Sequence, residues 1–253
     1  DGYISDPQNC VGNDSRDSSS KYWFVSLDEL ISDWEGKVRK TIFYQPANNP
    51  ANIKPSNPES WMKFSNALNY EITHSFDTLK NTSTGMFASR LIQHDLLNKN
   101  YKVYDYNYDS TFQNYQHIDE NPLFSGVNNS TGKNFSDPSY SNSHIIFSST
   151  GTPENPNFLK DISYTRLNRI ESLDTFRLRL LVPGDGLLQP GDLIDFKLPS
   201  LEVGSNGKIP DQFYNGKYLV TGIRHTFTRK EYRLNLDCSK ESLNNDVRRF
   251  NPK

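Results

Sequence analysis

Histidines, cysteines and carboxylates are the side chains of this sequence that could perform catalysis or hold a metal ion. A metal site needs three or four converging ligands. No histidine follows another histidine, a cysteine or an acidic residue at a spacing that one helix or hairpin would bring together. His94 and Asp95 are merely adjacent, and neighbours on a strand face opposite ways. We expect structural or surface roles for the five histidines, which are His74, His94, His117, His144 and His225.

The cysteines and the motifs lead to the same expectation. Cys10 and Cys238 are too few for a disulfide scaffold or an all-cysteine zinc site. The sequence has no nucleophile elbow, P-loop, dinucleotide glycine fingerprint or H-E-x-x-H motif. Carboxylate pairs such as Asp119-Glu120 are expected by chance among 30 acidic residues. We therefore predict no catalytic residue, no cofactor, no metal and no enzyme activity, although a glycosidase whose two carboxylates lie far apart in the sequence stays open.

The composition indicates a folded protein without a strong electrostatic preference. Hydrophobic residues make up only 34% of the 253 residues, but aromatic residues reach 13%, which disordered chains do not. A net charge of −2 gives no bulk attraction to DNA or to an anionic membrane. No apolar run approaches the roughly 20 residues of a membrane helix, so no membrane partner is expected.

The first part of the chain is divided by its polar and proline-rich stretches. Residues 1–20 are predicted to be a polar linker or loop, followed by a mixed α/β middle region over 21–157. Residues 21–25 form a strand candidate, and the capping-box spacing of Ser26 and Glu29 predicts a helix to about residue 34. Four prolines over 45–60 indicate an extended connection.

The rest of the middle region contains a strand, a short helix and a hairpin. Residues 69–76 alternate as a strand does, and Asp77 can cap a short helix over 77–83. Residues 86–95 and 102–108 suggest a hairpin, although leucines and isoleucine at 91, 92, 96 and 97 also fit a helix. Residues 109–156 are rich in Asn, Ser and Pro, with an apolar island at 145–147, and are expected to be an exposed insertion.

Residues 158–245 are predicted to hold a helix followed by a tube-like β-barrel, with a tail at 246–253. A helical apolar stripe spans 158–172, and four segments with strict period two follow. Ile194, Phe196 and Leu198 should face the core, with Asp195 and Lys197 turned outward. The alternation favours an antiparallel barrel or sandwich. The predicted fold class is α+β, mainly β. The four segments are 176–182, 194–198, 217–227 and 232–238.

Three segments of this C-terminal block resemble the sequence of a known protein family. It reads LVPGDGLLQPGDLIDFKLPS, YNGKYLVTGIRHTF and EYRLNLDCSKESL. In their order and spacing these segments resemble the tube-like barrel domain of the central baseplate hub proteins of T-even-type contractile-tailed phages (myoviruses), including marine and cyanophage relatives. Residues 24–30 and 75–108 also look like that family, so the match covers roughly 21–245 apart from the insertion. The matching positions are Pro190-Gly191-Asp192, Tyr214, Gly216, Tyr218, Val220, Ile223-Arg224-His225, Tyr232 and Leu236.

The resemblance implies a structural protein of the virion, located in the phage tail baseplate and assembled in the host cytoplasm. It implies a homotrimer in which two barrels per subunit form a pseudo-sixfold ring, the family's first barrel lying N-terminal to the matched region. Such a ring joins the threefold spike, a tail lysozyme protein, to the sixfold tail tube or its initiator ring. Baseplate wedge proteins are further expected partners. DNA would pass through the lumen without specific binding.

Two other functions stay open at this stage. One is a tail-associated cell-wall hydrolase or carbohydrate-binding module, which a cleft with an acidic pair and lytic activity would reveal. The other is a tail-tube or tube-initiator protein, which would form a sixfold ring. The +3 charge of residues 161–253 is the one feature that favours contact with DNA, and we expect it to serve subunit contacts.

Overall fold

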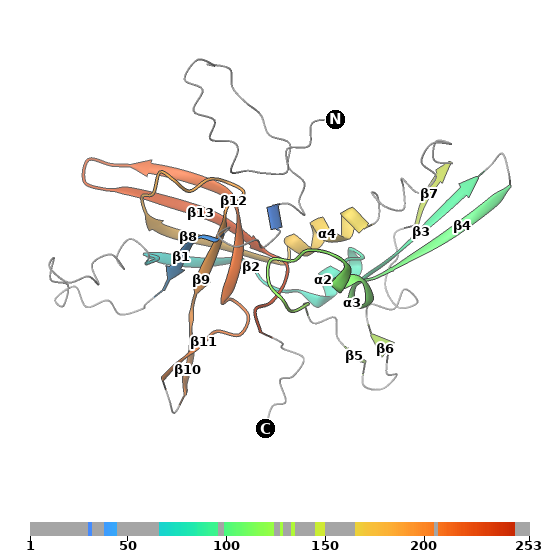
Figure 1. Ribbon diagram of the computed structural model, residues 1–253, viewed down its shortest axis with the longest axis horizontal. Helices are drawn as coiled ribbons and strands as arrows, with labels where there is room; N and C mark the ends of the chain where they lie inside the picture. The colour runs from blue at the N-terminus through green and yellow to red at the C-terminus, as the bar shows by residue number, and fades with distance from the viewer. Residues whose placement is uncertain are drawn as a thin grey trace, which may run out of the picture.

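The main structural unit is a six-stranded sheet with the strand order β1-β9-β12-β13-β8-β2 (Figure 1). The computed structural model describes residues 30–31, 38–44, 66–95, 99–123, 127–128, 133–134, 145–149, 165–204 and 207–245. Neighbouring strands are antiparallel except β1 and β9, which are parallel. The strands are β1 (Val38–Phe43), β2 (Asn69–His74), β8 (Phe176–Pro183), β9 (Leu193–Lys197), β12 (Gly216–Phe227) and β13 (Tyr232–Lys240).

Alternation along the strands builds one core, as the sequence predicts. In β8, Leu178 and Leu180 are buried while Arg177 and Arg179 are exposed. In β9, Ile194 and Phe196 are fully buried, and Asp195 is only partly covered. All six strands or their flanks contribute to a single cluster, and so do the turn residue Leu188 and the flanking Ala67. The predicted inward register of β9 is confirmed, and so is the mainly-β class.

Among the described residues the sheet does not close fully into a tube, because no ladder pairs its outermost strands β1 and β2. A single bridge, Phe43 to Asn66, joins the end of β1 to the segment before β2. There the amide of Ala67 donates to the carbonyl of Phe43 at 2.8 Å. The rings of Tyr44 and Tyr70 meet edge-on with centroids 4.6 Å apart. Side-chain packing at this seam therefore replaces a ladder of backbone hydrogen bonds.

A second sheet has the order β4-β3-β7 and projects from the main body in Figure 1. Strands β3 (Ala88–Asp95) and β4 (Asn100–Asn107) form the predicted hairpin, so the helical alternative for this segment is wrong. The apolar island at 145–147 belongs to β7 (Ile145–Ser149), which pairs with β3 in parallel. The remaining described strands are the short pairs β5 (Val127–Asn128) with β6 (Lys133–Asn134), and β10 (Pro199–Gly204) with β11 (Gly207–Pro210). The β10–β11 hairpin was not predicted.

The described helices are short and lie between the two sheets (Figure 1). Helix α2 (Thr78–Ser83) has the predicted cap, since the Asp77 carboxylate accepts from the amides of Leu79 and Lys80. Helix α4 (Thr165–Leu173) lies inside the predicted 158–172 helix apart from its last residue. Leu30 and Ile31 are helical, as the capping box predicts. The other described helices are α3 (Tyr108–Thr111) and the 3-10 turn η4 (Phe112–Asn114).

The expectation of an exposed insertion over 109–156 is wrong for its first part. Phe112, Ile118, Asp119 and Leu123 are buried. Asn121 forms a bridge with Leu243, just beyond β13. Polar composition misled here because the segment is held by specific polar contacts rather than by an apolar stripe. The predictions for 1–20, 21–25, 45–60 and 246–253 lie outside the described residues.

Candidate assembly surface

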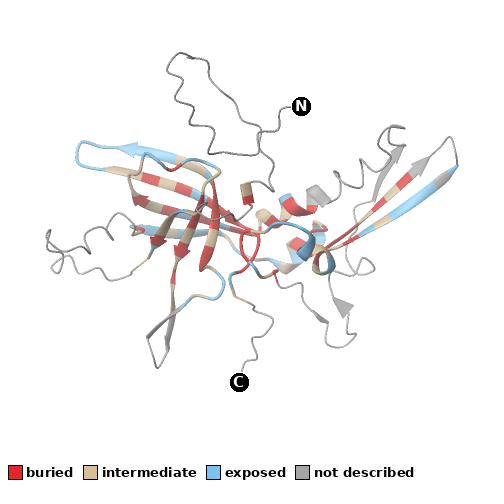
Figure 2. Ribbon diagram, viewed as in Figure 1, coloured by how far each residue is buried: buried red, intermediate tan, exposed pale blue. Residues whose placement is uncertain are grey.

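The β12–β13 hairpin extends well beyond the strand that flanks it. Strand β9 pairs only with Gly216–Leu219 of β12. Val220 is then held by the turn before β9, since its amide donates to Asp192 and its carbonyl accepts from Gly191. After a register shift between Val220 and Gly222, the rest of β12 pairs with β13 alone. Among the described residues, 222–227 therefore present an uncovered strand edge, and Figure 2 shows the end of this hairpin exposed.

The hairpin turn fixes which backbone groups point to the uncovered edge. The amide of Thr228 donates to the carbonyl of Glu231, so these residues form a hydrogen-bonded pair. Hydrogen-bonded and non-hydrogen-bonded pairs alternate along an antiparallel ladder. The next pair, Phe227 with Tyr232, is therefore of the second kind, as is His225 with Leu234. The amides of Phe227 and His225 consequently point away from β13, toward the uncovered edge.

An ordered group of aromatic rings covers the end of this hairpin. Phe227 is 72% exposed, and its ring stacks on Tyr232 with centroids 4.3 Å apart. His225 stacks on the same ring, and its Nδ1 lies 2.8 Å from the Tyr232 hydroxyl. Gly184 in the neighbouring turn lies against the Tyr232 ring, and a Cβ at this position would overlap that ring. Rings held this way lose little conformational entropy when they bind a partner.

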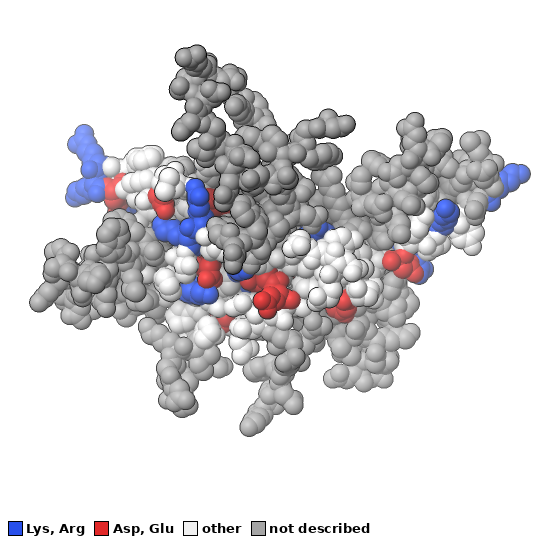
Figure 3. All heavy atoms as spheres, viewed as in Figure 1, with Lys and Arg blue, Asp and Glu red and all other residues white. Residues whose placement is uncertain are grey.

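Basic side chains surround these rings. Arg224, Arg229 and Lys230 are exposed, and Arg233 pairs with Glu231 at 2.6 Å. Figure 3 shows basic side chains gathered at the end of the hairpin. Arginine and exposed aromatic rings are enriched where protein interfaces gain most of their affinity. We call residues 222–233 the hairpin surface.

At the other end of the sheet, β2 has no second strand partner among the described residues beyond its contact with the end of β1. Strand β2 pairs with β8 on one side only. Glu71 and Ile72 in this strand are exposed, and Leu68, which lies just before the strand, is 50% exposed. One copy thus offers a basic strand edge and a second edge that carries a carboxylate.

His74 and His117 contact neighbouring side chains, and Cys238 is buried. His74 Nε2 lies 3.2 Å from the Lys80 ammonium, and His117 stacks on Phe112. The side chains of His94 and His144 lie outside the described residues. Cys238 is buried, and burial raises the pKa of its thiol, so the reactive thiolate is suppressed. No group of three His, Cys, Asp or Glu side chains suited to a metal ion occurs in the described part of the chain.

A buried ion pair joins the middle region to the end of β13. The Lys240 ammonium lies 3.0 Å from Asp119 Oδ2, with side-chain exposures of 0% and 3%. Lys240 also donates to the Asn215 carbonyl at 2.8 Å. Burial lowers the pKa of Lys240 and raises that of Asp119, while the opposite charge of each partner counteracts these shifts. A Cβ at Gly216 would lie 2.5 Å from Asp119 Oδ2, so this strand position requires glycine.

The residues that follow Lys240 extend this contact. We call the whole group the buried clasp, and its members are His117, Ile118, Asp119, Lys240, Glu241 and Ser242. Glu241 is 2% exposed, and its Oε1 lies 2.9 Å from His117 Nδ1 and accepts from the amide of Ile118. Ser242 Oγ accepts from the amide of Asp119 at 2.7 Å. Sequence analysis missed the clasp because its halves are more than 120 positions apart. The available signal was the polar run after Cys238, where the alternation of β13 stops.

No helix among the described residues is long and apolar enough to cross a membrane. No protein-family model matches the sequence, and no curated protein matches it. One similar solved structure is that of the tail protein from Neisseria meningitidis MC58, with 12% sequence identity and a TM-score of 0.39. The similarity covers 83% of this chain and 45% of that protein, so this chain spans less than half of its length.

Proposed function

We propose that this chain is a structural part of a contractile phage tail, the central hub of its baseplate, acting as a trimeric ring between spike and tail tube. The resemblance of residues 190–236 to hub proteins supports this function. In the structure the matched positions lie in β12 and β13 and in the turns that precede β9 and β12, and these three strands are neighbours in the main sheet.

The observation that carries this proposal is that no described strand covers the outer part of β12 or the outer edge of β2. Uncovered strand edges are normally blocked, or paired with another chain. Pairing two different edges of identical copies is a head-to-tail contact, which gives a closed ring when the rotation closes. Arg224 on one edge and Glu71 on the other have complementary charges. The proposal therefore assigns the subunit contact to these two edges.

Native mass spectrometry tests the assembly. The chain is expected to form a species of three times its 29.1 kDa mass at micromolar concentration, alone or with a threefold spike protein. A stable monomer under both conditions would contradict the proposal. A sixfold ring would favour a tail-tube protein, and lytic activity on bacterial cell walls would favour a hydrolase.

Replacing His225 by proline is expected to weaken the trimer about tenfold or more in its dissociation constant. The amide of His225 points to the uncovered edge, so proline removes a donor to the neighbouring copy while the β13 ladder keeps its bonds. The matched control is His225→Ala, which loses the same imidazole ring but retains the amide. Sedimentation equilibrium of both variants measures the effect. Equal weakening by proline and alanine would exclude strand pairing at this edge.

The proposed ring lets DNA pass without binding it tightly. A net charge of −2 provides few phosphate contacts, and six to ten such contacts would give affinity that falls about 10³–10⁵-fold with moderate salt. The assembled ring is expected to show only weak binding to duplex DNA in fluorescence anisotropy at about 50 mM salt. Tight association with a steep salt dependence would contradict the passive conduit and would move the basic hairpin surface to the lumen.

A further inference from the structure

The two faces of the outer part of β12 carry different side chains. Ile223 and Tyr232 pack against the main core, and the rings of His225 and Phe227 stack on Tyr232. The core side of this strand edge is therefore apolar and aromatic. Arg224 is exposed and stands between Ile223 and His225, so its side chain projects on the outer face of the sheet.

Strand β2 alternates in the same way, but its outer residue is acidic. The Tyr70 ring contacts Phe196 in the main core, and Ile72 lies on the same side of the strand and is 38% exposed. Glu71 lies between them and opposite the exposed Arg179, so it is on the outer face. Both strand edges thus present apolar or aromatic residues on the core side and a charged residue on the outer face.

The backbone groups of Tyr70 and Ile72 point to the outer edge of β2. The Gly184 amide donates to the Tyr232 carbonyl, so this pair between β8 and β13 is hydrogen-bonded. Alternation along the ladder turns the backbone groups of Leu180 toward β13 as well. Tyr70 lies opposite Leu180, so its own backbone groups point away from β8, and Ile72, two residues further, repeats this arrangement.

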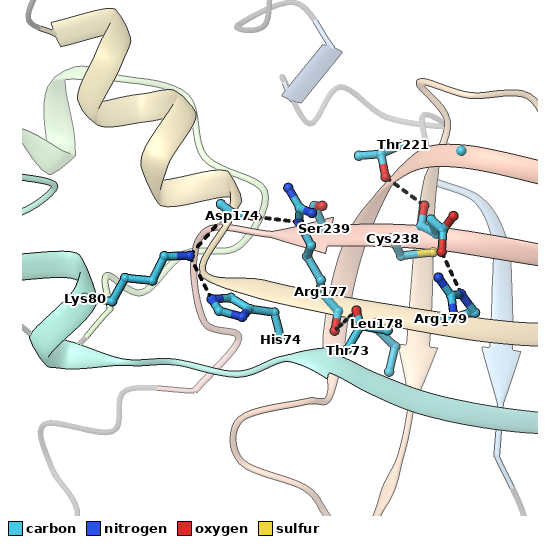
Figure 4. A pocket seen from close by; sticks show the side chains of 12 residues that line it. Thr73, His74, Lys80, Asp174, Arg177, Leu178, Arg179, Thr221, Cys238 and Ser239 are labelled. Carbon is cyan, nitrogen blue, oxygen red and sulfur yellow. Dashed lines mark hydrogen bonds and ion pairs between the residues drawn. The ribbon is translucent and has the colours of Figure 1, made fainter. Parts of the chain in front are cut away.

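The charge of Glu71 is only partly compensated within its own chain. Arg179, which is labelled in Figure 4, pairs with Asp237 at 2.9 Å and lies 3.5 Å from Glu71. Arg177, the preceding basic residue on this face of β8, contacts Asp174 instead. Two carboxylates therefore share one guanidinium, and the Glu71 side chain is 63% exposed. The outer face of β2 can accept a further cation.

We propose that β12 of one copy pairs antiparallel with β2 of a second copy, with Arg224 opposite Glu71. This register brings the 72% exposed Phe227 to Leu68, which is 50% exposed, so the main core extends from one copy into the next. It also forms hydrogen-bonded pairs from residues whose backbone groups already point to the two edges. These pairs are His225 with Tyr70 and Ile223 with Ile72.

A second β12 strand is a poorer partner for this edge. Two β12 strands side by side would gather their Arg224 side chains on one face, where like charges repel. Strand β2 offers the opposite charge on that face and apolar residues on the other. This inference rests on the proposed ring and specifies the register of its subunit contact.

A charge exchange in the intact chain tests this register. Arg224→Glu and Glu71→Arg are each expected to raise the dissociation constant of the trimer about tenfold or more, because each places like charges opposite one another. The double variant restores opposite charges and should return to within about threefold of the parent chain. The matched control is Arg229→Glu, since Arg229 is exposed on the same hairpin but lies beyond the paired residues. Sedimentation equilibrium measures all four variants.

A peptide separates the register from the ring itself. A fluorescein-labelled peptide of residues 68–74 is expected to bind the monomeric parent chain saturably in fluorescence anisotropy. The same peptide with lysine in place of Glu71 should bind the parent about tenfold more weakly, and should bind Arg224→Glu better than the parent.

The outcomes distinguish the two proposals. A trimer whose double variant is as weak as the single variants would overturn the register and leave the ring. A monomeric parent chain that binds the peptide with the expected charge dependence would contradict the ring and retain the pairing of these edges. In a monomeric chain, absent or charge-independent peptide binding would overturn the inference. Arg224 and Glu71 are exposed, so thermal melting should show that each variant still folds.

Discussion

Replacing Lys240 by methionine is expected to lower the free energy of unfolding by about 3–5 kcal/mol. Methionine retains most of the length of the side chain but removes the ammonium, which leaves Asp119 as a buried charge without its counterion. The ion pair is almost fully covered, with exposures of 0% and 3%. The Asn215 carbonyl also loses its donor. Urea unfolding of the variant and the parent chain measures the difference.

The double variant Lys240→Met, Asp119→Asn identifies the cause of this loss. An amide at position 119 is neutral and can still accept from the amide of Lys217, which now contacts the carboxylate. The double variant should therefore be more stable than Lys240→Met alone, a non-additive result typical of residues in direct contact. A loss below about 1 kcal/mol for Lys240→Met would show that water reaches the clasp.

Replacing Phe196 by aspartate is expected to cost on the order of 3–5 kcal/mol or more. Phe196 is fully buried at the centre of the main core, and its ring contacts those of Tyr70 and Tyr218. The substitution removes these aromatic contacts and places an unpaired carboxylate among apolar side chains. Thermal or urea unfolding should show a strongly destabilised or unfolded variant.

Asp195→Asn is the matched control for this substitution. Asp195 is the neighbouring residue of β9, faces the other side of the strand and pairs with the partly exposed Lys197 at 2.9 Å. The side chains of Asp195 and Lys197 are 20% and 40% exposed, and asparagine keeps the size and polarity of the side chain, so folding should be nearly unchanged. A ranking in which Asp195→Asn is the more damaging change would contradict the register of β9, since a shift by one residue exchanges the two faces of a strand.

Local patterns in the sequence were enough to predict most of the regular elements. The alternation in β8, β9, β12 and β13 predicts strands because a pleated strand directs successive side chains to opposite faces. Asp77 predicts the start of α2 because an aspartate before a helix satisfies amides of its first turn. The spacing of the apolar residues also predicts the hairpin of β3 and β4, but its register required the structure.

Contacts between distant segments were not predictable in this way. The contact between β1 and β2 depends on how far these strands separate, and the described residues have one bridge there and no ladder. The β10–β11 hairpin and the pairing of β7 with β3 likewise depend on which strands meet in space. Backbone hydrogen bonds between strands carry no residue-specific pattern, so such pairings leave little trace in a single sequence.

The sequence by itself determined the mainly-β class, the inward face of β9 and the cap of α2, because each depends on neighbours a few residues away. Only the tertiary structure decided that Asp119 and Lys240 meet inside the protein and that the sheet remains open at β1 and β2. It also decided that β12 extends past β9 and presents an edge that no described strand covers. Burial, ion pairing and edge exposure are properties of segments far apart in the chain, and they arise only when folding brings those segments together.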